Sequence, residues 1–261
     1  MLDIKKDLAE LDETYKTRPR QGLASILAYG ISGAGKTRLL LTCPRPLFIY
    51  QFDPDGSESI EDYVGIKHNI FVKDFSQDDP MSPTMFEAFS TDLSRRTKEG
   101  FFNYMATVTI DSVTTFGDIV MNWILRKAGR KSQPPEIQDW GMQVIKVRDT
   151  VKELLKLPCH IVVTGHEDAD KDDLLKIISG SIMITKRLRI VIPLLFSEMY
   201  RLKVEQGGKG ITRKMYITPD GIWVGKSRMG HDDKLEDVIE PDIRKALKQV
   251  GKLWEDKKLP E

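Results

Sequence analysis

The sequence predicts an α/β protein with a mainly parallel central sheet, helices on both faces and an antiparallel extension toward its C-terminal end. Two observations support this class. Short apolar runs typical of buried strands alternate with segments of helical character, which is the pattern of a parallel sheet covered by helices. After about residue 196 polar and apolar positions alternate instead, which is typical of antiparallel strands.

The N-terminal segment has a different composition from the rest of the chain. Apolar residues recur every three or four positions within residues 3–13, which predicts a short amphipathic helix. Residues 14–22 are polar and contain a proline and a glycine, so they are expected to form a linker. We therefore separate an N-terminal helix and linker (1–21) from a core (22–230).

Strands and helices are expected to alternate through most of the core. The expected strands are 23–29, 47–52, 106–110 and 160–164. The expected helices are 36–41, 85–98, 115–127 and 140–157. Such an order places the carboxyl ends of the parallel strands at one edge of the sheet, where ligands of open α/β folds bind.

The last third of the chain is predicted to form the extension. Residues 196–205 and 211–218 alternate in polarity around a glycine-rich connection, which indicates a hairpin. A tight turn then leads into a short strand at 222–224. Residues 234–254 are rich in charge and are expected to be helical, within a charged C-terminal tail at 231–261.

Composition excludes several classes of protein. The 261 residues carry 40 basic and 39 acidic side chains, a formal net charge of +1, so constitutive binding to nucleic acid through overall charge is not expected. The two cysteines, Cys43 and Cys159, lack metal-ligand spacing and cannot form a disulfide framework. No signal peptide is recognisable, and no apolar run approaches the ~20 residues of a membrane span. We expect a cytoplasmic protein without membrane contact.

The most specific motif is the run G-I-S-G-A-G-K-T at residues 30–37, which has the pattern G-x4-G-K-[ST]. Glycines let consecutive backbone N–H groups curve around phosphates, and the following helix directs its positive dipole end at the same anion. Lys36 is expected to reach the β- and γ-phosphates, and Thr37 to bind Mg²⁺. The alternative is a purely structural glycine turn. The expected nucleotide-binding residues are Gly30, Ser32, Gly33, Ala34, Gly35, Lys36, Thr37 and Arg38.

A second acidic group is needed beside such a loop to complete the Mg²⁺ site. The apolar run 106–110 ends at Asp111, which is followed by Ser112. Asp111 is therefore the expected partner of Thr37 at the metal. The alternative is an aspartate that begins a turn or caps the next helix.

The order of these motifs resembles the RecA-like ATPase core. The phosphate loop is followed by a strand ending in acidic residues at 53–58, by a strand ending in Asp111, and by a strand ending in Gly165–His166. More narrowly, residues 22–230 resemble the phage-encoded ATPases of the AAA_24 type, which include RecA-like single-strand annealing proteins of phage recombination modules. The resemblance implies a RecA-like P-loop fold, ATP as the nucleotide, Mg²⁺ as the cofactor and ATP hydrolysis as the activity.

The resemblance also implies a catalytic carboxylate after the second strand and a γ-phosphate sensor after the fourth. Asp53 best matches the carboxylate that orients the attacking water, with Asp55 and Glu58 as alternatives. The family usually has glutamate there, so the shorter aspartate implies slow hydrolysis. His166 matches the polar sensor. The alternative interpretations are turn residues for Asp53 and a structural histidine for His166.

Two cations near the end of the core resemble a finger that acts on the neighbouring subunit. Lys226 and Arg228 flank Ser227 after the last short strand. In oligomeric RecA-like proteins such a pair reaches the next subunit's ATP and stabilises charge on the transferred phosphoryl group. This role requires a homo-oligomer, either a ring or a filament. The alternative is two solvated surface cations.

Two basic segments are candidates for contacts with single-stranded DNA. The resemblance places one DNA-binding loop between the helices near residue 130 and another after His166. The first segment is basic, the region 167–175 is acidic, and further cations follow near residue 186. The alternative is ordinary solvated surface. The candidate residues are Arg126, Lys127, Arg130, Lys131, Lys186 and Arg187.

These expectations lead to three functional hypotheses. The first is an oligomeric ATPase that binds single-stranded DNA and anneals complementary strands in phage recombination, alone or together with a phage or host single-strand binding protein. The second is a hexameric helicase-like or loader ATPase of phage replication. The third is a nucleotide-dependent switch that binds a protein partner and hydrolyses ATP weakly. In all three, Lys36 and Asp53 belong to the catalytic set.

Overall fold

The computed structural model describes residues 4–172, 177–207, 210–230 and 234–260. Its α-helices are α1 (Ile4–Lys16), α2 (Lys36–Leu40), α3 (Met85–Lys98), α4 (Val113–Lys127), α5 (Ile137–Leu154), α6 (Lys186–Leu195) and α7 (Ile243–Gln249). Its strands are β1 (Ser25–Gly30), β2 (Leu47–Gln51), β3 (Ile70–Asp74), β4 (Thr107–Asp111), β5 (His160–Asp172), β6 (Ile177–Ile182), β7 (Glu198–Gly207), β8 (Gly210–Tyr216), β9 (Lys226–Ser227) and β10 (Val238–Ile239). The short 3₁₀ helices are η1 (Glu58–Tyr63), η2 (Ile66–His68) and η3 (Phe101–Asn103).

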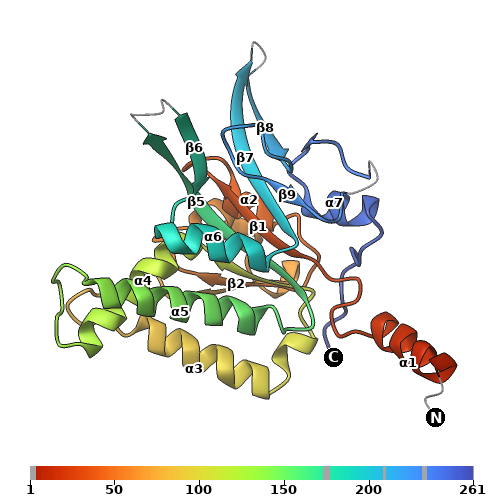
Figure 1. Cartoon of the computed structure of the whole chain (residues 1–261), viewed down its shortest axis with the longest axis horizontal. Coiled ribbons are helices and arrows are strands. Elements are labelled where there is room, and N and C mark those ends of the chain that lie inside the picture. The colour runs from red at the N-terminus through yellow and green to blue at the C-terminus, as the bar shows by residue number, and fades with distance from the viewer. Residues whose placement is uncertain (1–3, 173–176, 208–209, 231–233, 261) are drawn as a thin grey trace.

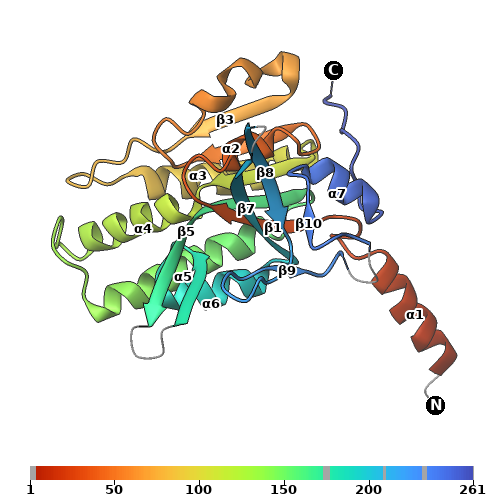
Figure 2. The same cartoon turned by 90° about the horizontal axis from the view of Figure 1, so that it is seen from above.

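Helices cover both faces of the central sheet, as the sequence predicts. Helices α3, α4, α5 and α6 lie together on one face, and α2 and α7 lie on the other (Figures 1 and 2). The strands contribute alternate side chains to the two sides. In β1, for example, Leu27 and Tyr29 belong to the core under the larger helical layer, whereas Ile26 and Ala28 belong to the core under α2 and α7.

The sheet has the strand order β10-β8-β7-β1-β5-β4-β2-β3. Neighbouring strands from β7 to β3 run parallel, so their carboxyl ends share one edge. This edge brings Gly30, Gln51 and Asp111 into register with the strand end that carries His166. The predicted mainly parallel α/β sheet is confirmed, and it collects the phosphate loop, the second-strand acids and Asp111 at one place.

The predicted antiparallel extension is also confirmed, with differences in its details. Strands β7 and β8 form the expected hairpin, and β7 joins the sheet by pairing in parallel with β1. Gly30 makes this junction possible, because a Cβ there would come within 2.6 Å of the Leu202 carbonyl oxygen. The strand expected at 222–224 is reduced to one bridge at Trp223, and the following strand is β9.

Two segments depart from the expected elements. Strand β5 continues past His166 to Asp172 and forms an antiparallel hairpin with β6, where a loop is expected. Residues 173–175 of the acidic segment lie outside the described residues. The expected helix at 234–254 is confined to α7, because Pro241 prevents an earlier start, Asp242 caps the helix and Gly251 follows it with φ 70°.

The N-terminal helix stands apart from the rest of the molecule. Helix α1 projects from the core at the N-terminal end (Figures 1 and 2). None of its described residues is buried, and its apolar side chains at Ile4, Leu8, Leu11 and Tyr15 are all more than half exposed. None of the helices in the described part of the chain combines the length and the hydropathy needed to cross a membrane.

Candidate functional site

The phosphate loop connects β1 to α2 and has the backbone shape expected for an anion cradle. Gly33 and Gly35 adopt positive φ angles of 76° and 93°, which favour glycine. A Cβ at Gly33 would meet nothing within 4 Å, so the residue faces open space. The Nζ of Lys36 lies 3.1 Å from the Gly30 carbonyl oxygen and 3.0 Å from that of Ile31. The lysine is thus folded back along the loop, with its ammonium group held at the cradle.

Thr37, at the start of α2, contacts Asp111, the last residue of β4, as a shared metal site requires. The Thr37 hydroxyl donates a 2.8 Å hydrogen bond to Oδ2 of Asp111, and the Thr164 hydroxyl donates to Oδ1. Burial raises the pKa of Asp111, against the effect of these two hydrogen bonds. A buried carboxylate beside a hydroxyl and a phosphate cradle has the oxygen donors that Mg²⁺ prefers. The residues present therefore fit the expected ion.

The other ligands of this ion would come from the nucleotide. Among the described residues, no group of three or more His, Cys, Asp or Glu side chains is arranged to hold a metal. Mg²⁺ characteristically uses one or two protein oxygens, substrate phosphates and water. Thr37 and Asp111 would supply the protein oxygens, and the ion would neutralise charge between the β- and γ-phosphates.

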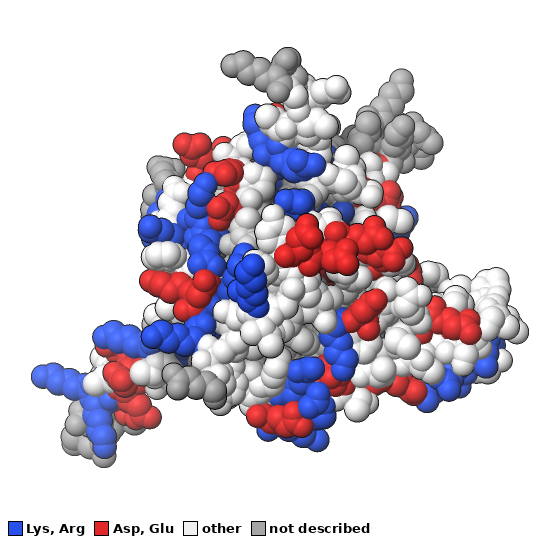
Figure 3. Space-filling view, turned by 180° about the vertical axis from the view of Figure 1, so that it is seen from behind, with Lys and Arg blue, Asp and Glu red and all other residues white. Residues whose placement is uncertain are grey.

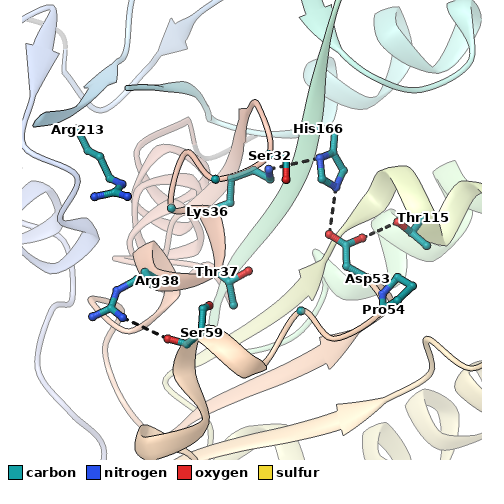
Figure 4. Close-up of a pocket in the computed structure, with 13 residues that line it drawn as sticks. Ser32, Lys36, Thr37, Arg38, Asp53, Pro54, Ser59, Thr115, His166 and Arg213 are labelled. Atoms are coloured by element: carbon teal, nitrogen blue, oxygen red, sulfur yellow. Dashed lines mark hydrogen bonds and ion pairs between the residues drawn. The ribbon is translucent and has the colours of Figure 1, made fainter. Parts of the chain in front are cut away.

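His166 links the phosphate-loop lysine to Asp53. Its Nδ1 lies 3.4 Å from Nζ of Lys36, and its Nε2 lies 3.1 Å from Oδ2 of Asp53. Figure 4 shows the imidazole between these two side chains, with Thr115 beyond the aspartate. The backbone N–H of His166 is itself held by the Thr114 hydroxyl at 3.0 Å. The sequence predicted Lys36, Asp53 and His166 for the site, but not the contacts that join them.

The second-strand carboxylate that reaches the pocket is Asp53. It lines the cavity, whereas the alternatives Asp55 and Glu58 do not. Its Oδ1 accepts hydrogen bonds from the hydroxyls of Ser112 and Thr115. Burial alone raises the pKa of Asp53, but its hydrogen bonds outweigh burial and lower that pKa to about 2. Asp53 is therefore a fixed anion at neutral pH and a hydrogen-bond acceptor rather than a strong base.

The cavity around this cluster has a volume of about 520 Å³, which is in the range of nucleotide-sized sites. Two features of its lining were not predicted. Ser59 accepts a hydrogen bond from Arg38 through its carbonyl oxygen. Arg213, on β8, approaches from the opposite side of the loop (Figure 4). Arg213 belongs to no motif, and only the pairing of β8 within the sheet brings it here.

Lys226 and Arg228 lie outside this cavity. The Nζ of Lys226 donates a 2.6 Å hydrogen bond to the Pro193 carbonyl oxygen, so its charge is directed at α6. The Arg228 side chain is exposed, and its guanidinium has no hydrogen bond or ion pair among the described residues. Glu198 anchors this segment, and sequence reasoning missed it. Its buried carboxylate accepts from the Ser227 hydroxyl and from the backbone N–H groups of Arg228 and Met229.

The candidate DNA-binding cations divide into two groups. Arg126, Lys127 and Arg130 are engaged within the chain. The first two lie near Glu87, at 3.9 Å and 2.6 Å, and Arg130 contacts Asp139 at 2.6 Å. The remaining three are exposed and have no ion pair among the described residues, namely Lys131, Lys186 and Arg187.

Charge of both signs is mixed over the described part of the face in Figure 3. An acidic cluster lies to one side of its middle, and basic side chains gather beside it in a strip interrupted by acidic and neutral residues. This distribution agrees with the near-zero net charge. Contacts with nucleic acid would therefore depend on a few positioned cations rather than on a broad basic field.

Comparison with known proteins adds to this geometry. The model of the AAA_24 family, described as an AAA domain, matches residues 23–229. The chain belongs to this family. The matched region contains all five members of the cluster at the carboxyl edge, Lys36, Thr37, Asp53, Asp111 and His166. Family membership and the phosphate-loop geometry together identify a P-loop domain of the ATPase type.

The other comparisons are weaker. A solved structure of a KaiC-like protein from the hyperthermophilic archaeon Pyrococcus horikoshii is similar at 12% sequence identity and a TM-score of 0.43. That match covers 75% of this chain and 78% of the archaeal chain. None of the curated proteins matches the sequence.

Proposed function

We propose that this protein is a RecA-like ATPase that hydrolyses Mg²⁺-bound ATP between subunits of a homo-oligomer. The observation that carries the proposal is the single cluster formed by three side-chain contacts. Thr37 meets Asp111 at the place for the metal ion, and His166 joins Lys36 to Asp53 at the place for the γ-phosphate. These contacts join Lys36 and Thr37 of α2 to residues from three strand segments, and Lys36, Thr37, Asp53 and His166 all line one cavity.

Each residue has a definite task in this proposal. The N–H groups of the loop and Lys36 hold the β- and γ-phosphates, which requires the ammonium group to leave the carbonyl oxygens of Gly30 and Ile31. His166 then donates to a γ-phosphate oxygen. Asp53 retains acceptor capacity on Oδ2 and orients the attacking water, while its low pKa makes it a poor proton acceptor. Hydrolysis is therefore slow without a further stabilising charge.

That further charge is assigned to Arg228 of a neighbouring subunit. The guanidinium is exposed, lies outside the cavity of its own chain and sits on a segment fixed by Glu198. A rigid, exposed arginine suits a finger that acts in trans, because the planar guanidinium can contact two phosphate oxygens at once. Lys226 is directed at α6 and supports the segment. ATP bound at one subunit would then hold the next one in place.

Complementation between two inactive variants tests this arrangement. Arg228→Ala should lower kcat about 10³-fold, and Lys36→Ala should abolish hydrolysis. A mixture of the two should regain activity, because an intact phosphate loop from one variant meets an intact Arg228 from the other. The measurement is steady-state ATP hydrolysis at several mixing ratios. If Arg228→Ala alone retains wild-type kcat, or if mixing restores nothing, the trans role of Arg228 is wrong.

The same proposal includes single-stranded DNA as the substrate on which the oligomer assembles in the cytoplasm of a bacterial host. Lys131, Lys186 and Arg187 are the best candidates for phosphate contacts, because their charges are not neutralised by described acidic groups. Arg126, Lys127 and Arg130 would contribute only by exchanging the ion pairs they now make. The role would be annealing in phage recombination, alone or with a phage or host single-strand binding protein.

DNA binding is tested with a charge-matched pair of triple variants. Replacing Lys131, Lys186 and Arg187 by alanine should weaken binding to a single-stranded oligonucleotide and reduce the salt dependence by about two units of slope. The control removes Lys234, Lys245 and Lys248, which lie in and near α7, and should bind as the wild type does. Annealing of complementary strands with ATP should fall in parallel. Absence of single-strand binding by the wild type in every nucleotide state would exclude this role.

Two rival functions use the same site. Strand displacement on a forked duplex would favour a helicase-like motor or loader over an annealing protein. A protein-binding switch with weak hydrolysis is favoured by one observation, which is that Ser112, Thr115 and His166 already engage Asp53. ATP hydrolysis that stays slow with DNA present, together with nucleotide-dependent capture of a protein, would support the switch.

A further inference from the structure

The strand β8 brings one arginine against the phosphate loop of its own chain. Arg213 pairs with Val204 of β7, in the hairpin that extends the sheet beyond β1. Its side chain leaves the strand and lies over Gly35, so closely that a Cβ on that glycine would be 3.1 Å from both Cδ and Nε of the arginine. The same side chain lines the cavity that contains Lys36 and Thr37.

The charge of Arg213 is not compensated within the described part of the chain. No hydrogen bond or ion pair of its guanidinium is found there, whereas the next residue, Lys214, pairs with Glu205 at 2.9 Å. The cavity lining holds three basic side chains, Lys36, Arg38 and Arg213, against one carboxylate. Backbone N–H groups of the loop and the start of α2 add to this positive potential. A polyanion is the ligand that such a lining favours.

The arrangement also indicates which part of the polyanion Arg213 meets. His166 and Asp53 lie on one side of Lys36, and Arg213 and Arg38 lie on the other (Figure 4). The γ-phosphate belongs on the His166 side, because Lys36 reaches the β- and γ-phosphates. The nucleotide must therefore leave the loop past the two arginines, with its α-phosphate and ribose on that side.

We propose that Arg213 is a nucleotide-binding residue that acts in cis, on the α-phosphate and ribose end of the bound nucleotide. This assignment rests on the proposed function, since it takes the cavity as the ATP site. It differs from the roles of His166 and Arg228, which depend on the γ-phosphate. Arg213 holds nucleoside diphosphates and triphosphates equally, and it ties the β7–β8 hairpin to the occupied loop.

Nucleotide binding by the full chain tests this role. Arg213→Ala should weaken the affinity for fluorescent ADP and for a non-hydrolysable ATP analogue by the same factor, about tenfold or more, since a charge-assisted contact is lost. The nucleotide affinity of Arg213→Lys should lie between those of Arg213→Ala and the wild type. The matched control is Lys214→Ala, which removes a charge from the same strand outside the cavity and should bind as the wild type does. Because Arg213 is exposed, melting without nucleotide should be unchanged.

Three outcomes separate failure of this inference from failure of the proposed function. Unchanged ADP affinity in Arg213→Ala, with a wild type that binds and hydrolyses ATP, overturns the inference alone. Weakened ATP affinity with unchanged ADP affinity also overturns it, because the residue would then act on the γ-phosphate. A wild type that binds neither nucleotide overturns the proposed function itself.

Discussion

Strand β5 carries two histidines, six residues apart, that differ in position and in contacts. His160 starts the strand, is 3% exposed and accepts a 3.0 Å hydrogen bond from the backbone N–H of Ala24 through Nδ1. His166 follows the parallel segment, is partly exposed and lies between Lys36 and Asp53. One histidine satisfies the backbone of a neighbouring strand, and the other belongs to the cavity.

The difference teaches that place in the fold, not residue type, separates a structural histidine from a functional one. Both side chains belong to the same buried strand, and each contacts another part of the chain. Only the end of the parallel part of β5 opens toward the phosphate loop, because β1, β2 and β4 end at the same edge of the sheet. At the opposite end, Ala24 and the C-terminal segment enclose His160.

Of the two histidines, His166 is expected to give the larger effect when it is removed. His166→Ala should lower kcat for ATP hydrolysis by about 10²–10³-fold, which is the usual cost of losing one donor to a developing charge. Affinity for ADP should stay close to that of the wild type, because the proposed contact of His166 is with the γ-phosphate, which ADP lacks. Steady-state hydrolysis and fluorescent ADP binding measure the two quantities.

A conservative variant sharpens this expectation. His166→Asn keeps a polar donor near Nδ1 but is too short to reach Asp53, so it should lose only part of the activity. The free energy of unfolding should change little in both variants. If His166→Ala unfolds the protein or leaves kcat unchanged, then His166 resembles His160 and the contrast between the two ends of β5 is wrong.

Much of the fold and of the central site could be predicted from the sequence, because local signals carry them. The glycine pattern at 30–37 specifies a loop of defined shape, and Asp111 ends an apolar strand. Chain order alone then places His166 at the same edge. Helix 85–98 was predicted with its observed bounds, because its ends coincide with changes in composition.

The remaining parts depend on contacts between distant segments. Arg213 and Glu198 belong to no motif, and each acquires its position only when the β7–β8 hairpin joins β1. Four hydroxyls fix Asp53 and Asp111, and three of these contacts were not predicted, namely those of Ser112 and Thr115 at the start of α4 and of Thr164 on β5. The expected C-terminal helix was too long because composition indicated helix and a single proline overrode it.

The C-terminal extension also carries two residues of the same type in different places, as β5 does. Arg213 on β8 lies against the phosphate loop of its own chain, whereas Arg228 after β9 does not line the cavity at that loop. Strand β7 pairs with both β8 and β9. A single strand thus supports both arginines, the one that we propose binds the nucleotide of its own subunit and the one that we propose acts on a neighbour.

A smaller effect is expected at the structural end of β5, as a dependence of stability on pH. Burial lowers the pKa of His160 to about 4, and the charges of Arg20, Lys257 and Lys252 act in the same direction, against a hydrogen bond with the Leu253 backbone. The fold therefore favours neutral imidazole. Its contribution to the free energy of unfolding is complete above the unfolded-state pKa near 6.5 and is lost progressively as the pH falls from there toward 4.

Chemical denaturation at pH 7.5 and pH 5 measures this loss, which should be about 2 kcal/mol at pH 5 from the difference between the two pKa values. His160→Asn offers an amide oxygen to the backbone N–H of Ala24 but does not titrate in this range. Its free energy of unfolding should change less between the two pH values than that of the wild type, and the difference between the two proteins isolates His160 from all other groups. An equal change in the free energy of unfolding for both proteins would contradict this prediction. It would mean that His160 becomes charged as readily in the folded protein as in the unfolded chain.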